Sequence, residues 1–161
     1  MNEIPDITKA WSAGLFDGEG CINIQRAFPG GRVTPPFILE ARVTNTARQS
    51  LEILQQTFGG RIYHLRGEKR QWADCFQWYI YGSKAAQFLR CIYPYLVTKR
   101  ETAQLALEFY DSCRSYTTTE LRRGPQAMPI TEVQRREDLR NRVLSHCANQ
   151  KQEGKSDASA P

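Results

Sequence analysis

The stretch Ser12–Gly20 reads SAGLFDGEG and sets small and apolar residues directly before two acids. Small residues at Ala13 and Gly14 would let a second helix approach closely, and carboxylates at a helix end are hard oxygen ligands that suit magnesium. One carboxylate per chain is too few for a strong site, so two chains related by a two-fold axis would be needed. Spacing alone favours a simpler interpretation, in which Asp17 and Glu19 are exposed turn acids.

The residues around this stretch alternate between helical and strand patterns. Asp6 is suited to cap a helix that runs to about Asp17. The segments 21–28 and 37–44 alternate with period two around turn residues 29–36, which indicates a hairpin. Thr46 and Gln49 have capping-box spacing and open a second helix that Gly59 and Gly60 end. Segments 61–66 and 74–81 form a second hairpin.

Helical segments complete the chain. They are expected over about 83–92, from about Thr98 to Cys113, and from Thr131 to Cys147. The order predicts an α+β fold of the type αββαββα, in which two antiparallel hairpins join into one sheet beneath helices, with further C-terminal helices. Residues 1–147 are predicted to be a single domain, and residues 148–161 have the composition of a flexible tail.

Composition limits the function classes. The chain has 161 residues, five scattered cysteines, two histidines and a net charge of +5. We expect no signal peptide, no membrane span and a reducing compartment, so the protein should not be secreted. The cysteine spacing argues against a zinc site, and two histidines cannot build a histidine metal cluster. The positive charge favours a polyanion partner, although many basic proteins bind none.

The polar face of the predicted sheet is the first functional indication. Its side chains match the donor and acceptor patterns of base edges in the major groove of DNA, and a two-stranded ribbon fits that groove. A solvated sheet face has a similar composition, so both interpretations stay open on this feature alone. The candidate DNA-binding residues on this face and at the hairpin ends are Asn23, Gln25, Arg32, Thr34, Glu40, Arg42, Arg66, Arg70, Gln77 and Tyr79.

SAGLFDGEG resembles the nine-residue motif of LAGLIDADG homing endonucleases. It departs from that motif at Ser12, Phe16 and Gly18, and at Glu19, which stands in place of the final Asp. The segments VTNTARQSLEILQQTFGGRI and IYPYLVTKRETAQLAL resemble two further parts of that family, so the resemblance covers roughly residues 8–110. The motif occurs once. Family members with one motif act as homodimers, which implies an interface between two motif helices at Ala13 and Gly14.

The resemblance also implies roles for single residues. Glu19 matches the metal-binding acid, and the carbonyl of Gly18 matches a backbone ligand. Lys99 matches the basic residue of the active site, and Asn45 matches a polar residue that orients solvent near the scissile phosphate. A basic position of the solvent network aligns with Gln49, and the adjacent Arg48 is an alternative for it. His64 points to DNA in the family's register, and a packed or solvated histidine is the competing view.

The resemblance implies a site-specific, intron-encoded endodeoxyribonuclease that makes double-strand breaks with short 3′ overhangs in a long pseudo-palindromic duplex. The implied cofactor is Mg²⁺, with Mn²⁺ as a substitute and Ca²⁺ supporting binding without cleavage. The implied partners are double-stranded DNA and a second copy of the chain, with no membrane and no small-molecule substrate. A cytoplasmic or organellar location follows. The alternatives are an intron maturase that binds RNA and a cleavage-inactive DNA-binding protein.

Overall fold

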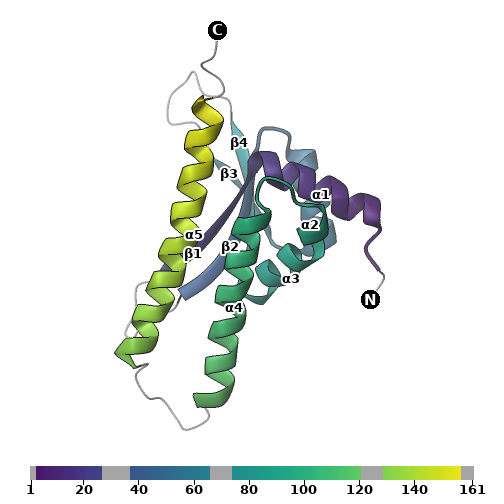
Figure 1. The fold of residues 1–161 in the computed structure, drawn as a ribbon. Coiled ribbons are helices and arrows are strands. Elements are labelled where there is room, and N and C mark those ends of the chain that lie inside the picture. Colours follow the sequence, from purple (N-terminus) through teal and green to yellow (C-terminus); the bar gives the residue numbers. More distant parts are fainter. Residues whose placement is uncertain (1–2, 27–36, 66–73, 121–128, 157–161) are drawn as a thin grey trace.

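The computed structural model describes residues 3–26, 37–65, 74–120 and 129–156. Arg32, Thr34, Arg66 and Arg70 lie outside these residues. Figure 1 shows the arrangement of the elements, with α4 and α5 side by side. In chain order the elements are α1 (Asp6–Glu19), β1 (Gly20–Arg26), β2 (Phe37–Asn45), α2 (Arg48–Phe58), β3 (Arg61–Leu65), β4 (Cys75–Tyr81), α3 (Ser83–Ile92), the 3₁₀ turn η1 (Tyr93–Tyr95), α4 (Arg100–Glu120) and α5 (Ile130–Ser156).

The two hairpins join through β2 and β4 into one antiparallel sheet of order β1-β2-β4-β3. This confirms the α+β class and the αββαββα order. Gly20 pairs with Val43 at one end of the β1–β2 ladder, and Arg26 pairs with Phe37 at the other. The end of α1 therefore lies at the same end of the sheet as the last residues of β2.

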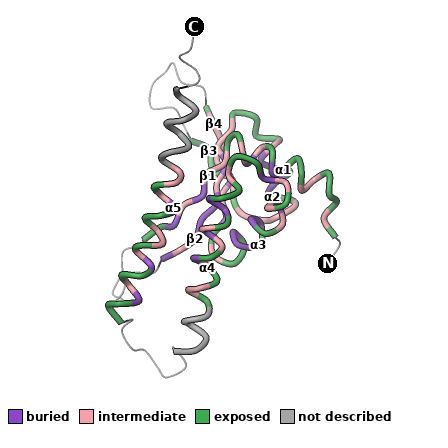
Figure 2. Tube along the Cα trace, in the orientation of Figure 1, coloured by how far each residue is buried: buried purple, intermediate pink, exposed green. Residues whose placement is uncertain are grey.

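The core lies between one face of the sheet and the helices, where the tube of Figure 2 is coloured as buried. Strand residues with period two supply the sheet side, as their alternation predicts: Ile22, Ile24, Phe37, Leu39, Ala41, Val43, Trp78 and Ile80. From the helices, Phe16 and Phe58 each contact the ring of Phe88 edge-on, at centroid distances of 5.2 and 4.9 Å. These contacts join α1, α2 and α3 into one layer.

Two predicted helix caps are wrong. Asp6 is the first residue of α1 and bonds Lys9, while Pro5 occupies the cap position. The Thr46–Gln49 capping box does not form, because α2 begins at Arg48 with no side-chain cap. Instead the side chain of Asn45 accepts a hydrogen bond from the backbone N–H of Ala47 at 2.8 Å, a local turn that asparagine often makes.

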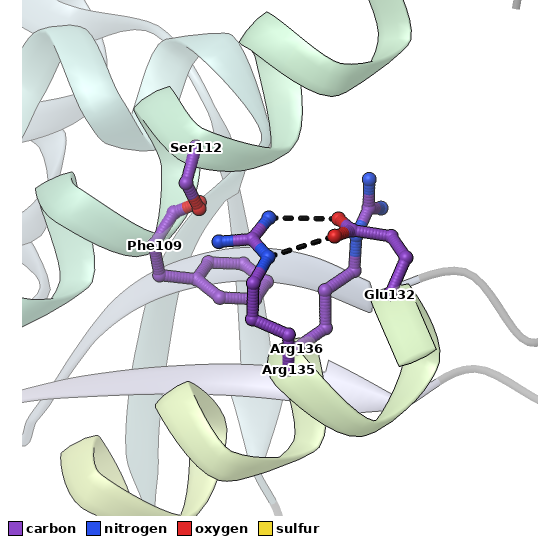
Figure 3. A network of polar contacts seen from close by, with 5 residues as sticks. All are labelled: Phe109, Ser112, Glu132, Arg135 and Arg136. Carbon is purple, nitrogen blue, oxygen red and sulfur yellow. Dashed lines mark hydrogen bonds and ion pairs between the residues drawn. The ribbon is translucent and has the colours of Figure 1, made fainter. Parts of the chain in front are cut away.

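The last helix packs along the edge strand β1. Arg140 donates from Nε to the carbonyl of Ile24 at 2.8 Å, so it satisfies a backbone group that has no strand beside it. Figure 3 shows the first turn of α5, where Glu132 lies against Arg135 and Arg136. The helix continues to Ser156, past the start of the segment whose composition suggests a flexible tail. None of the helices in the described ranges is long and apolar enough to cross a membrane.

Candidate nucleic-acid cleavage site

The motif acids lie where α1 passes directly into β1. Glu19 is the last residue of α1, and both Glu19 and Gly18 are exposed. Gly20 begins β1 at a place that leaves no room for a side chain. A Cβ built there would lie 2.4 Å from the backbone oxygen of Phe16. This glycine therefore lets the helix and the strand meet at a sharp junction that presents Glu19.

Asp17 and Lys99 hold two distant parts of the chain together. The carboxylate of Asp17 accepts hydrogen bonds from the backbone N–H groups of Val97 at 2.7 Å and Lys99 at 2.8 Å. The ammonium of Lys99 in turn donates to the backbone carbonyl of Asp17. Asp17 thus organises the connection that precedes α4, and it fixes the Lys99 side chain at the end of α1.

Lys99 is half-buried, and this burial lowers the pKa of its ammonium below the ordinary 10.5. The negative charges of Asp17 and, more weakly, Glu19 act in the opposite sense and raise the pKa of Lys99. A lysine in this environment can give up a proton more readily than a solvated one. The structure therefore brings together Glu19, Gly18 and Lys99, as the sequence predicts.

Asn45 lies at the same end of the sheet, two residues beyond Val43, the partner of Gly20. Its Oδ1 accepts a hydrogen bond from the backbone N–H of Ala47 just before the start of α2, so this oxygen already has a partner within the chain. Arg48 is held by Glu52 at 2.8 Å and lies over the ring of Phe76. Its position next to the end of β2 keeps it a candidate for the basic solvent-network position, and Gln49 beside it is exposed.

The outward face of the sheet forms a shallow hollow of about 470 Å³. It is lined by Gln25, Ile38, Glu40, Arg42, Tyr63, Gln77, Tyr79 and Tyr81. Five of these residues are among the predicted DNA-binding residues, and Asn23 belongs to the same strand face as Gln25. Sequence reasoning missed Tyr63, although its pairing with Gln77 in β3–β4 places it on this face.

Polar and aromatic contacts hold the side chains that line the hollow in place. Glu40 is 8% exposed and lies 3.6 Å from a guanidinium nitrogen of Arg42. Gln77 donates to the hydroxyl of Thr44 at 3.0 Å. The stacked rings of Tyr63 and Tyr79 share a hydroxyl hydrogen bond of 2.8 Å, which lowers the pKa of Tyr63 and raises that of Tyr79.

His64 does not belong to this face. It pairs with Phe76 in the β3–β4 register and stacks on that ring at 5.0 Å, on the side of the sheet that carries Trp78 and Ile80. Its Nε2 lies 3.0 Å from the carboxylate of Asp74. The register therefore favours the competing view for His64, a side chain that stacks on the Phe76 ring and stays exposed to solvent, and contact of His64 with DNA stays a prediction.

Ala13 and Gly14 occupy different environments. Ala13 has no exposed surface and packs within its own chain, so it cannot supply the surface of a dimer interface. Gly14 is exposed, and a Cβ at this position would meet no atom within 4 Å. Ile7, Trp11 and Gly18 are exposed at helical spacing on either side of Gly14.

The oxygen donors at the end of α1 suit a hard cation. Glu19 offers a carboxylate and Gly18 a backbone carbonyl, which are the ligand types of magnesium. A pocket of about 280 Å³ beside them includes Lys99 and Thr102. Thr102 is 1% exposed, and its hydroxyl has no hydrogen-bond partner within the described part of the chain. Within the described ranges, no group of three or more His, Cys, Asp or Glu side chains could hold a metal ion.

Comparison with known proteins agrees with this architecture. Neither protein-family models nor curated protein sequences give a match. Among solved structures, the homing endonuclease I-CvuI in complex with the I-CreI target is similar with a TM-score of 0.67 and 21% identity, over 87% of this chain and 82% of that chain. An archaeal intron-encoded homing endonuclease, I-Vdi141I, complexed with DNA, gives 0.62 at 18% identity, over 88% and 84%.

A third similar structure is the LAGLIDADG meganuclease I-AabMI bound to uncleaved DNA, with a TM-score of 0.63 and 18% identity. This match covers 87% of the present chain and 47% of that chain. The chain therefore has the fold of LAGLIDADG homing endonucleases.

Proposed function

We propose that this chain is a magnesium-dependent, site-specific endodeoxyribonuclease that acts as a homodimer on a long pseudo-palindromic DNA duplex. The observation that carries the proposal is the junction at the end of α1. There the contacts of Asp17 with Val97 and Lys99 place a half-buried lysine beside the exposed Glu19. The solved structures with this fold include complexes with DNA in the presence of Mg and of Ca.

Each part of the site has a task in this proposal. Glu19 and the Gly18 carbonyl would hold the metal, which when bound makes water more acidic and stabilises charge on the phosphate and the leaving oxygen. Lys99 would stabilise negative charge that develops on the phosphate or pass a proton to the solvent. Asn45, or Arg48 next to it, would orient that solvent.

The sheet face would read the sequence. Gln25, Arg42 and Gln77 are hydrogen-bonding side chains in the hollow, with the reach to contact base edges in the major groove. Glu40 is held by Arg42, so its acceptor oxygens would be available in a fixed orientation. Each good bidentate contact would contribute about 1–3 kcal/mol of discrimination between bases.

The exposed side of α1 supports the proposed second copy. Gly14 and Gly18 have open space around them, so packing within the chain does not explain the absence of a side chain. Together with the exposed Ile7 and Trp11 they form a flat apolar stripe that allows two helix backbones to approach. Such packing would bring one Glu19 from each chain together. The match to about half of I-AabMI is consistent with two copies in the active unit.

Replacing Glu19 by Gln tests the metal role. The substitution removes a charged ligand and leaves the sheet face intact. Cleavage of a target duplex in Mg²⁺ should therefore fall below about 1% of wild type, while binding in Ca²⁺ stays within about threefold. Glu108→Gln, an exposed acid on α4, is the matched control and should cut normally. Cutting by Glu19→Gln at the wild-type rate would contradict the proposal, and binding without cutting by the wild type would favour a cleavage-inactive DNA-binding protein.

A further inference from the structure

Two cysteines that are distant in the sequence converge beside the candidate active site. Cys21 lies on β1 and Cys147 on α5. The Sγ atom of each donates to the backbone oxygen of Ile22 at 3.7 Å. Because both sulfurs contact one atom, the distance between them cannot exceed twice this value. Neither takes part in a disulfide in this structure.

The same two side chains line the pocket of about 280 Å³ at the end of α1, together with Asp17, Gly18 and Lys99. Both sulfurs lie close enough to Lys99 for their charges to act on its ammonium. The guanidinium of Arg42 donates to Cys21 Sγ at 3.9 Å. Two basic side chains thus lie near the sulfurs.

The other three cysteines lie in different surroundings. Cys75 contacts the carbonyl of Leu65 at the β3–β4 end of the sheet. Cys91 is on α3 near Lys9 and Asp6, and burial raises the pKa of its thiol. Cys113 is on α4, where burial likewise raises the thiol pKa. Convergence on one backbone oxygen therefore sets Cys21 and Cys147 apart from these three.

We propose that Cys21 and Cys147 form a reversible redox modification site, which a small-molecule disulfide converts into a Cys21–Cys147 bond across the pocket of Lys99. The Cys21 thiolate attacks the small disulfide and releases one thiol. The Cys147 thiolate then attacks the resulting mixed disulfide and releases the second thiol. The protein loses two electrons and two protons, and the small disulfide is reduced to two thiols.

The bond would change the site because the two sulfurs must approach to about 2.05 Å. Both side chains now line the pocket and would have to turn toward each other. The bond would then tie α5 to β1 at a position two residues after Glu19. Access to Lys99 would be reduced. The effect on cleavage rests on the proposed nuclease function, whereas formation of the bond and the change at Lys99 do not.

The test treats the full-length protein with oxidised glutathione, maps disulfides by mass spectrometry, and measures acylation of the Lys99 amine before and after. We expect a Cys21–Cys147 cross-link as the main product together with a loss of Lys99 labelling. Adding dithiothreitol should remove the cross-link and restore the labelling. Lys84, which is exposed on α3, is the internal control and should label equally throughout.

Cysteine variants sharpen the outcome. Cys147→Ser should stop at a mixed disulfide on Cys21, and Cys91→Ser should still form the cross-link. Pairing of either cysteine with another partner, or unchanged Lys99 labelling in the cross-linked protein, would overturn the proposal. Reduced protein that fails to cut DNA would count against the nuclease function alone, because the mapping and the labelling need no cleavage.

Discussion

At the scale of single residues, the motif acids have separate tasks. The carboxylate of Asp17 accepts hydrogen bonds from two backbone N–H groups, so its role is structural. Glu19, two residues later, is exposed at the start of the sheet. Gly20, which follows Glu19, has a φ of −80°, a value that any residue can adopt. A glycine is needed here because a Cβ would clash with Phe16.

Gly20→Ala should accordingly destabilise the fold by about 1–3 kcal/mol, the usual cost of forcing extra volume into a packed region. Gln56→Ala, an exposed position on α2 outside the proposed site and interface, is the control, since alanine favours the helix. Chemical denaturation of both variants measures the difference. Equal stabilities for the two variants would show that the α1–β1 junction tolerates a side chain.

At the scale of elements, alternation in the strands predicts most of the sheet correctly. Ile22 and Ile24 are buried and Gln25 is exposed, because a period of two is fixed by strand geometry. Helix starts are predicted less well. The local capping box at Thr46 is replaced by the side chain of Asn45, and the start of α4 is organised by Asp17 from a distant helix.

Likewise, the sequence predicts some residues of the candidate site and not others. Glu19 and Lys99 could be assigned from sequence through a family resemblance, and the structure brings their segments together. The face on which His64 lies could not be predicted, because the face of β3 depends on its register with β4, which the short exposed strand does not reveal. Tyr63 was missed for the same reason. The burial of Ala13 also depends on tertiary packing, since helical spacing does not say which small residue faces inward.

The first turn of α5 provides a pH-dependent prediction at this scale. Glu132 is 8% exposed and bonds Arg135 and Arg136 at 2.7 Å (Figure 3). The hydrogen bond from Arg135, and then that from Arg136, hold the pKa of this carboxyl below its ordinary 4.5. The stabilisation is therefore complete above the ordinary value and is lost as the pH falls through the folded-state pKa.

Glu132→Gln should lower the free energy of unfolding by about 1–3 kcal/mol at pH 7. The gap from wild type should close in acid. Denaturation of both proteins at a series of pH values measures the gap, with Asp138→Asn on the exposed side of the same helix as the control. A gap that stays constant down to acid pH would show that charge is not the cause.

At the scale of the whole molecule, the proposed cleavage site requires two copies of the chain. Gly14 is exposed, and its lack of a side chain has no explanation within the chain. Gly14→Leu should therefore separate the two helices and lower both the dimer content and the cleavage rate, by overpacking that costs about 1–3 kcal/mol. Gln87→Leu, an equally exposed change on α3, should alter neither. Sedimentation with and without DNA measures the assembly, and a wild type that cuts both strands as a stable monomer would refute the two-fold arrangement.

The most direct measurement exposes wild-type and Glu19→Gln protein to a randomised duplex library in Mg²⁺ and sequences both the cut ends and the bound duplexes. If the protein is the proposed homodimeric nuclease, wild type should cut one long, nearly palindromic site and leave short 3′ overhangs. Glu19→Gln should enrich the same site by binding but yield no cut ends. Cut ends from both proteins, or bound duplexes without cut ends from the wild type, would contradict the claim that Glu19 and Lys99 form a DNA-cleaving site.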